Sequence, residues 1–194
     1  MVQGFERERA AIRSGDLREA RRLLVVAATR PLTREQRATQ RVTLAEVLLL
    51  TAEREEAVRL ATLALTESPA PAEQARAHVV RAVAHADAGD LTAALAEFRR
   101  GIELARSTAL PAEIARAQVR LLATLAERLD DGHLSALAPD VRQNVVRAGD
   151  PHLSIHFYLA EGRLAAKLGA IDRAWHHFDL AAALLPIEPN HVIE

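Results

Sequence analysis

The sequence predicts an all-α protein, and three observations lead to that prediction. Hydrophobic residues make up 49% of the 194 residues and aromatic residues only 3%, so alanine and leucine supply most of the apolar content. Alanine, leucine, arginine and glutamate all favour helices. Apolar positions recur at steps of three and four residues, which is the spacing along one face of a helix. A repeated turn pattern then divides the chain into helix pairs.

The repeated pattern is a small or polar turn followed by an alanine five residues later. Gly15, Gly89 and Gly169 begin three copies, and a fourth copy begins at Ala52 without a glycine. The alanines that follow these turns are Ala20, Ala57, Ala94 and Ala174. The first three are 37 residues apart, and the last lies 80 residues further on. That gap leaves room for one divergent unit of about 40 residues.

Five units of two helices each follow from this spacing. Prolines mark the boundaries, and we expect units at about 1–32, 33–70, 71–110, 111–150 and 151–186. The predicted helix pairs are 3–14 with 17–29, 34–51 with 54–67, 72–88 with 91–106, 112–129 with 133–148, and 152–168 with 171–185. Thr33 and Gln36 have the spacing of a capping box at the start of the second unit. Pro71 and Pro111 are expected in the first turn of their helices.

The fourth unit departs most from the pattern. The stretch Asp130-Asp131-Gly132 is interpreted as an insertion in a solvated turn. Pro139 is predicted to interrupt the second helix of the unit or to delay its start. The last stretch, 187–194, is interpreted as the start of a further, truncated helix. This leads to the hypothesis that the chain is a fragment of a longer protein with more helices or an output domain.

The last unit carries a resemblance to a known family. Its small residues, aromatic residues and closing proline fall at Tyr158, Gly162, Gly169, Ala174, Phe178, Ala181 and Pro186. In this spacing the chain resembles the tetratricopeptide repeat family, although its period of 37 to 40 residues exceeds the family's 34. The resemblance implies a single repeat domain over 1–194, a right-handed α-solenoid of about five antiparallel helix pairs. Phe98 and Phe178 are then expected to fill the groove to a neighbouring unit.

The charge balance excludes some classes of partner. The 25 Lys and Arg residues against 26 Asp and Glu residues argue against a dedicated binder of nucleic acid or of membranes. Residues 1–41 hold ten arginines against five acidic residues, and we interpret them as a solvated face with ion pairs such as Glu19 with Arg22. The chain has no cysteine, no membrane-spanning apolar run and no signal-peptide pattern, so a cytoplasmic location is the default expectation.

Catalytic motifs are absent from the sequence. It contains no phosphate-binding loop, no G-x-S-x-G turn and no H-E-x-x-H pattern. His152 and His156 share a helix face but lack a third ligand at a fixed spacing, so packing is the better interpretation than metal binding. His78 and His85 also share a face, where they would line a groove or make a structural hydrogen bond. We therefore expect no enzyme activity, no cofactor and no metal site.

The resemblance also implies where a partner would bind. In the tetratricopeptide family the first helix of each pair lines the partner groove, which predicts a floor of small aliphatic residues with arginines along it. The predicted residues are Arg76, Val79, Val83, Arg116, Val119, Arg120, His156, Leu159 and Arg163. Such a floor suits an amphipathic or acidic-flanked segment of a protein or peptide. The chain would then be a non-enzymatic sensor or scaffold segment of a larger bacterial regulator. The alternative is a self-association module that forms a homodimer.

Overall fold

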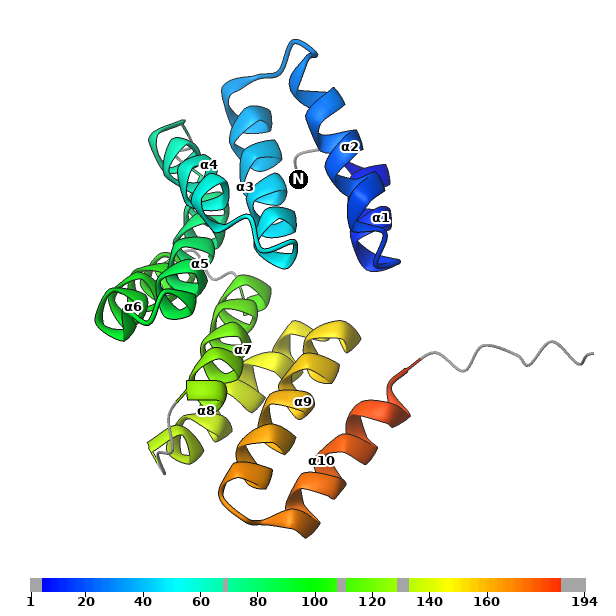
Figure 1. Cartoon of the computed structure of the whole chain (residues 1–194), viewed down its shortest axis with the longest axis vertical. Coiled ribbons are helices and arrows are strands. Elements are labelled where there is room, and N and C mark those ends of the chain that lie inside the picture. Colours follow the sequence, from blue (N-terminus) through cyan, green and yellow to red (C-terminus); the bar gives the residue numbers. More distant parts are fainter. Residues whose placement is uncertain (1–4, 68–69, 108–110, 129–132, 186–194) are drawn as a thin grey trace, which may run out of the picture. The chain divides into compact units, whose positions relative to one another are not determined.

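The computed structural model describes residues 5–67, 70–107, 111–128 and 133–185, and the regular elements in these ranges are all α-helices (Figure 1). The ten helices of these ranges match the predicted pairs to within about three residues at each end. They are α1 Glu6–Arg13, α2 Leu17–Ala28, α3 Arg34–Leu50, α4 Arg54–Glu67, α5 Pro71–Asp87, α6 Leu91–Ser107, α7 Pro111–Arg128, α8 His133–Ala148, α9 Pro151–Lys167 and α10 Ile171–Ala183. Among these described helices, none is both long and apolar enough to cross a bilayer.

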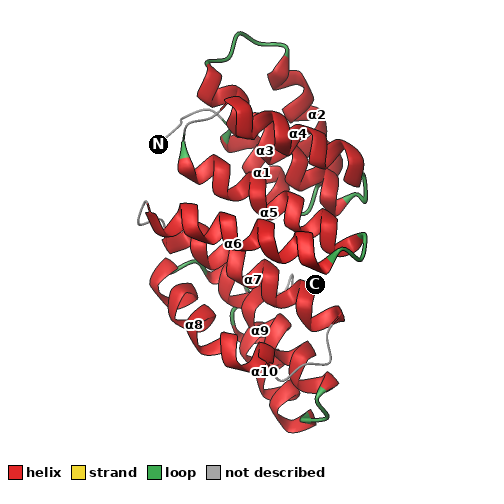
Figure 2. Cartoon of the chain, turned by 90° about the vertical axis from the view of Figure 1, so that its left-hand side faces the viewer, coloured by secondary structure: helices red, strands yellow, loops and turns green. Residues whose placement is uncertain are grey.

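The chain forms two compact units, Met1–Ala117 and Gln118–Glu194, and each is described by itself. In the N-terminal unit each helix from α1 to α6 lies beside the next helix along the chain (Figure 2). In addition, α3 packs against α5, the helix two places further on. In the C-terminal unit α9 packs against both α8 and α10. The unit boundary falls within α7, between Ala117 and Gln118.

The predicted turns share one backbone conformation. Gly15, Ala52, Gly89 and Gly169 all have φ between 63° and 85°, in the left-handed region that favours glycine. After α3, the Glu53 N–H donates to the Leu48 carbonyl at 2.8 Å, the long-range bond of a Schellman helix ending. The repeat therefore holds in the copy that lacks glycine, where Ala52 adopts the conformation that glycine takes in the other three.

Alanines pack the contact between paired helices in the N-terminal unit. Ala20 and Ala57 are fully buried and Ala94 is 1% exposed, as the repeat predicts. Larger side chains such as Leu24 and Leu48 complete the core around α2 to α4. The buried Gln40 amide donates to the Leu24 carbonyl at 2.8 Å and so ties α3 to the preceding pair. The start of α3 carries the predicted capping box, with Thr33 and Gln36 bonded reciprocally.

The helices α9 and α10 approach closely at a glycine, which has no side chain. Gly162 of α9 lies against the Phe178 ring of α10, where a β-carbon would come 2.4 Å from the ring. Ala174 and Ala181 are each 3% exposed on the same helix as Phe178. The expectation that Phe178 fills a groove to a neighbouring unit is therefore corrected, because its ring packs inside its own helix pair.

The prediction for Pro139 is wrong. The helix α8 begins at His133 and runs through Pro139 to Ala148 without interruption. A proline inside a helix removes one backbone hydrogen bond and crowds the preceding turn. Pro139 itself is exposed, so its ring lies outside the core. The interpretation of Asp130 to Gly132 as an insertion and the expected helix at 187–194 lie outside the described residues.

Candidate functional site

A groove of about 780 Å³ lies in the C-terminal unit, between side chains of α8, α9 and the start of α10. The α9 wall is a stripe along one helix face, formed by Glu161, Leu164 and Ala165 and by Leu168, the residue just after the end of α9. Opposite it, α8 contributes Ala138, Pro139, Arg142, Gln143, Val146 and Arg147, and α10 contributes Arg173. The floor is apolar, since Leu164 and Ala165 are buried, and the three arginines are exposed. A groove of this size and composition suits a short peptide segment or a small ligand.

A buried carboxylate fixes one of the three arginines. The Glu161 side chain is 8% exposed, and its Oε2 atom accepts a hydrogen bond of 2.8 Å from Nη2 of Arg142. The same guanidinium lies 5.7 Å from the centre of the buried Phe157 ring, in a cation–π arrangement. The carboxylate and the ring together hold Arg142 in place although half of its side chain is exposed. A buried charge needs such a partner, because removing it from water is costly.

Behind Glu161 lies a buried histidine. The His177 side chain is 7% exposed, and its Nδ1 atom is 3.5 Å from Oε2 of Glu161. The imidazole stacks with the Tyr158 ring at a centroid distance of 6.3 Å. Burial is the main cause that lowers the pKa of His177, the Glu161 carboxylate acts in the opposite direction, and Arg142 adds to the lowering. His177 is therefore neutral at pH 7, and Nδ1 makes no hydrogen bond within the described structure.

Four of the predicted groove residues belong to the N-terminal unit. Arg76 donates to Glu46 at 2.7 Å and to the Thr43 hydroxyl at 3.0 Å, so its guanidinium joins α5 to α3. Val79 and Val83 are each 9% exposed and contribute to packing within α5 and its neighbours. Arg116 is half-buried on α7. Partner binding by these four residues stays a prediction.

The other five predicted residues belong to the C-terminal unit. Val119 is 4% exposed, Arg120 and Leu159 are half-buried, and His156 and Arg163 are exposed. Although His156 keeps part of its surface in solvent, partial burial is the main cause that lowers its pKa, and Arg120 is the next. Arg163 is a further, smaller cause, so the structure brings His156 into electrostatic range of both arginines. Partner binding by these five residues also stays a prediction.

One further histidine, His78, takes part in a local group of charged side chains. His78 pairs with Glu97 at 2.7 Å, and the other oxygen of Glu97 pairs with Arg81 at 2.7 Å, which joins α5 to α6. This is the structural hydrogen bond expected for His78, although it lies within a helix pair rather than between units. Among the described residues, no group of three or more His, Asp and Glu side chains is arranged to hold a metal ion. The pair Asp130-Asp131 lies outside the described residues.

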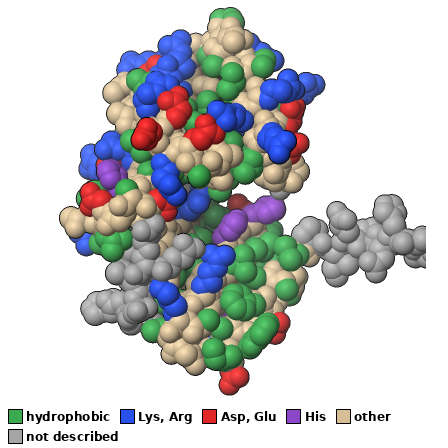
Figure 3. Space-filling model, in the orientation of Figure 1, with side chains coloured by type: hydrophobic (Ala, Val, Ile, Leu, Met, Phe, Trp, Pro, Cys, Tyr) green, Lys and Arg blue, Asp and Glu red, His purple; other side chains and the backbone are tan. Residues whose placement is uncertain are grey.

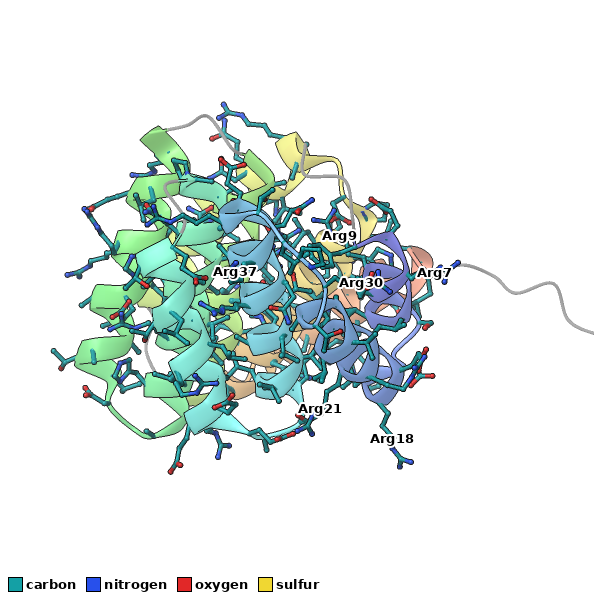
Figure 4. The ribbon with its side chains drawn as sticks, turned by 90° about the horizontal axis from the view of Figure 1, so that it is seen from above. Arg7, Arg9, Arg18, Arg21, Arg30 and Arg37 are labelled. Atoms are coloured by element: carbon teal, nitrogen blue, oxygen red, sulfur yellow. The ribbon has the colours of Figure 1, made fainter. Side chains whose placement is uncertain are left out.

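The arginines of the first three helices do not converge on one site. Figure 4 shows Arg7 and Arg18 pointing outward in different directions, with other arginines spread along α1, α2 and α3. Arg21 binds Glu53 through two bonds of 2.6 and 2.9 Å. Arg22 binds Glu19 as predicted, and this hydrogen bond lowers the pKa of Glu19. Charged side chains of both signs are interspersed over this unit (Figure 3), as expected for a solvated face.

One helix face in the C-terminal unit is apolar and exposed. Ile171 and Trp175 lie one turn apart on α10 and are 54% and 65% exposed. Leu168, just before the turn to α10, is 46% exposed, and Leu185 beyond its end is 55% exposed. Figure 3 shows hydrophobic side chains gathered over α9 and α10. Clustered exposure of large apolar residues is typical of a surface that contacts another protein.

The sequence analysis missed the groove and its central residue, Glu161. A local signal was present, because Glu161 lies four residues after Phe157 and three before Leu164, on an apolar helix face. A glutamate on the buried face of a helix is rare unless it is paired. The partner, Arg142, is 19 residues away on another helix, and no fixed spacing points to it.

No protein-family model, curated protein or solved structure matches this chain.

Proposed function

We propose that the chain is a non-enzymatic module that binds a segment of a partner protein in the groove between α8 and α9. The observation that carries this proposal is the groove itself, which has an apolar floor at Leu164 and Ala165, a wall about two helical turns long from Glu161 to Leu168, and three exposed arginines beside it. Its α9 wall has the spacing at which a helix offers a continuous stripe to a partner. Val146, which is 71% exposed on the opposite wall, is a large apolar side chain available to such a segment.

The architecture we propose for the whole chain is a right-handed α-solenoid of antiparallel helix pairs, similar to tetratricopeptide repeats. The support is the register of the left-handed turns at Gly15, Ala52 and Gly89, which are 37 residues apart, and the burial of the alanine five residues after each. Helix-pair solenoids present long surfaces to protein partners. This architecture is consistent with a sensor or scaffold segment of a larger bacterial regulator, located in the cytoplasm.

The experiment uses a displayed library of random peptides of about 12 residues, long enough to span the groove. The library is selected on the full chain, and the selected peptides are measured against two double variants. The groove variant carries Val146→Glu and Leu168→Glu, and the matched control carries Val25→Glu and Leu50→Glu. All four positions are between 46% and 71% exposed, so none of the changes alters the core. Circular dichroism checks that both variants keep the helicity of the unchanged chain.

We expect selected peptides to bind the unchanged chain and the control variant and to lose affinity for the groove variant by about tenfold or more. A selection that yields no binding peptide would overturn the proposal. So would peptides that bind the groove variant as tightly as the control, because the binding site would then lie elsewhere.

Self-association is a second candidate function, favoured by the exposed apolar face of α10. Ile171 and Trp175 would become buried if that face packed against a second copy of the chain. Light scattering across a concentration series would then give a mass near twice 21.2 kDa that falls on dilution. Ile171→Ser with Trp175→Ser should keep the mass at that of one chain, and a constant single-chain mass for the unchanged protein would remove this candidate.

A further inference from the structure

The charges that line the groove are unbalanced. Among the described residues that line it, Arg142, Arg147 and Arg173 are basic and Glu161 is the only acidic one. Counting these four side chains gives a net charge of +2. The low-dielectric floor of Leu164 and Ala165 strengthens the field of charges at the rim.

One of the three arginines is paired within the chain, and the other two have no partner among the described residues. Arg142 is bonded to Glu161 at 2.8 Å and lies over the Phe157 ring, so its charge is largely neutralised within the chain. Arg147 and Arg173 are exposed and have no hydrogen-bond or ion-pair partner among the described residues. Guanidinium groups bind carboxylates with paired hydrogen bonds, and this geometry makes arginine suited to recognising Asp and Glu.

We infer that the groove selects an acidic segment, in which an apolar side chain packs on Leu164, Ala165 and Leu168 while flanking Asp or Glu carboxylates bind Arg147 and Arg173. This inference rests on the function proposed above and names the chemistry of its partner. Basic segments are disfavoured because each Lys or Arg would meet two unpaired positive charges. A long polyanion such as nucleic acid is disfavoured because none of the described residues that line the groove is aromatic, so none can stack on a base.

The bond between Glu161 and Arg142 gives Glu161 a positioning role in the groove. By holding Arg142 against α9, its carboxylate keeps that guanidinium over the Phe157 ring and in a defined position on the wall. Glu161 is thus a positioning residue, and the ligand's carboxylates are bound by the two arginines that it does not engage.

The test compares one selected acidic peptide with its amide version, in which each Asp becomes Asn and each Glu becomes Gln. Both peptides are titrated against the unchanged chain and against Arg147→Gln with Arg173→Gln. The matched control is Arg18→Gln with Arg99→Gln, which removes the same charge from two exposed arginines of the N-terminal unit that also lack a partner among the described residues. The control separates a specific contact from the general effect of net charge.

For the unchanged chain we expect the amide peptide to bind about tenfold more weakly than the acidic peptide, with a difference that shrinks as salt rises. The variant lacking Arg147 and Arg173 should no longer distinguish the two peptides, and the control variant should still do so.

Two results would overturn the inference while leaving the proposed function intact. One is an amide peptide that binds within about twofold of the acidic one. The other is a set of selected peptides that lose affinity for the Val146→Glu, Leu168→Glu variant but carry no excess of Asp and Glu. If no peptide depends on the groove at all, the proposed function fails and this inference fails with it.

Discussion

The Phe178 ring lies directly against the backbone of Gly162 where α10 crosses α9. A β-carbon on Gly162 would be 2.4 Å from Cε1 and 2.7 Å from Cδ1 of that ring. Carbon atoms in contact are normally about 3.5–4.0 Å apart. The absence of a side chain at position 162 therefore sets how closely the two helices approach.

Gly162→Ala should lower the free energy of unfolding by up to about 2 kcal/mol, because overpacking costs about 1–3 kcal/mol and the better helix propensity of alanine returns about 1 kcal/mol. Urea unfolding followed by circular dichroism measures the change. In a Phe178→Leu background the ring is gone, so the same substitution should cost less or become stabilising. A Gly162→Ala protein more stable than the unchanged chain would contradict the packing described above.

Ala52→Gly should stabilise the protein. Ala52 has a φ of 63°, a conformation that costs a non-glycine residue about 1–2 kcal/mol, while glycine adds unfolded-state freedom of about 0.5–1 kcal/mol. The expected net gain is about 0.5–1 kcal/mol in the free energy of unfolding.

The matched control for this turn is Gly89→Ala at the equivalent position of the next repeat. Nothing lies within 4 Å of a β-carbon there, so only backbone strain opposes the substitution. It should destabilise the protein by about 1 kcal/mol. Changes of the same sign at both positions would show that the turns are not equivalent.

The repeat was predictable from the sequence because its signals are local. Ala20 and Ala57 are buried as their 37-residue spacing predicts, and the turn at Ala52 keeps its conformation without a glycine. Both features depend on a few neighbouring residues along one chain segment. Pro139 shows the limit of local reasoning, because α8 runs through this exposed proline although the residue type predicts an interruption.

The groove could not be predicted in the same way. Its walls come from three helices, and the bond that organises it joins Glu161 to Arg142 across 19 residues of sequence. The side chains of α8 can only be assigned to a wall once its position beside α9 is known. Packing between helices also limits what can be predicted for a single residue. Val79 is predicted to face a partner, but it is only 9% exposed in the N-terminal unit.

Ala174→Leu should also destabilise the protein. Ala174 is 3% exposed on the side of α10 that faces the core, where a larger side chain would push the helices apart. The expected loss is about 1–3 kcal/mol in urea unfolding. Ala182→Leu makes the same change at an exposed position of the same helix and should have little effect. Equal effects of the two substitutions would mean that position 174 is not a packing contact.

The free energy of unfolding should fall as the pH drops below about 6.5, in part because of His177. Burial holds the pKa of His177 below its ordinary value of 6.5, so the unfolded chain takes up a proton at a higher pH than the folded chain. Its contribution is fully present above that ordinary value and is lost as the pH falls from there toward the folded pKa. Urea unfolding at several values between about pH 8 and pH 5 measures this dependence.

His177→Gln separates the titration from the packing of the ring. At about pH 8 His177 is neutral in both states, so the difference between the two proteins reports the loss of packing and of the stack on Tyr158. As the pH falls, only the unchanged chain loses the contribution of His177, and the difference between the two proteins should therefore shrink. Burial also lowers the pKa of His156, so the variant should keep part of the dependence. Two curves that stay parallel over the whole range would mean that His177 takes up its proton equally well in the folded and unfolded chain, which its burial beside Arg142 should prevent.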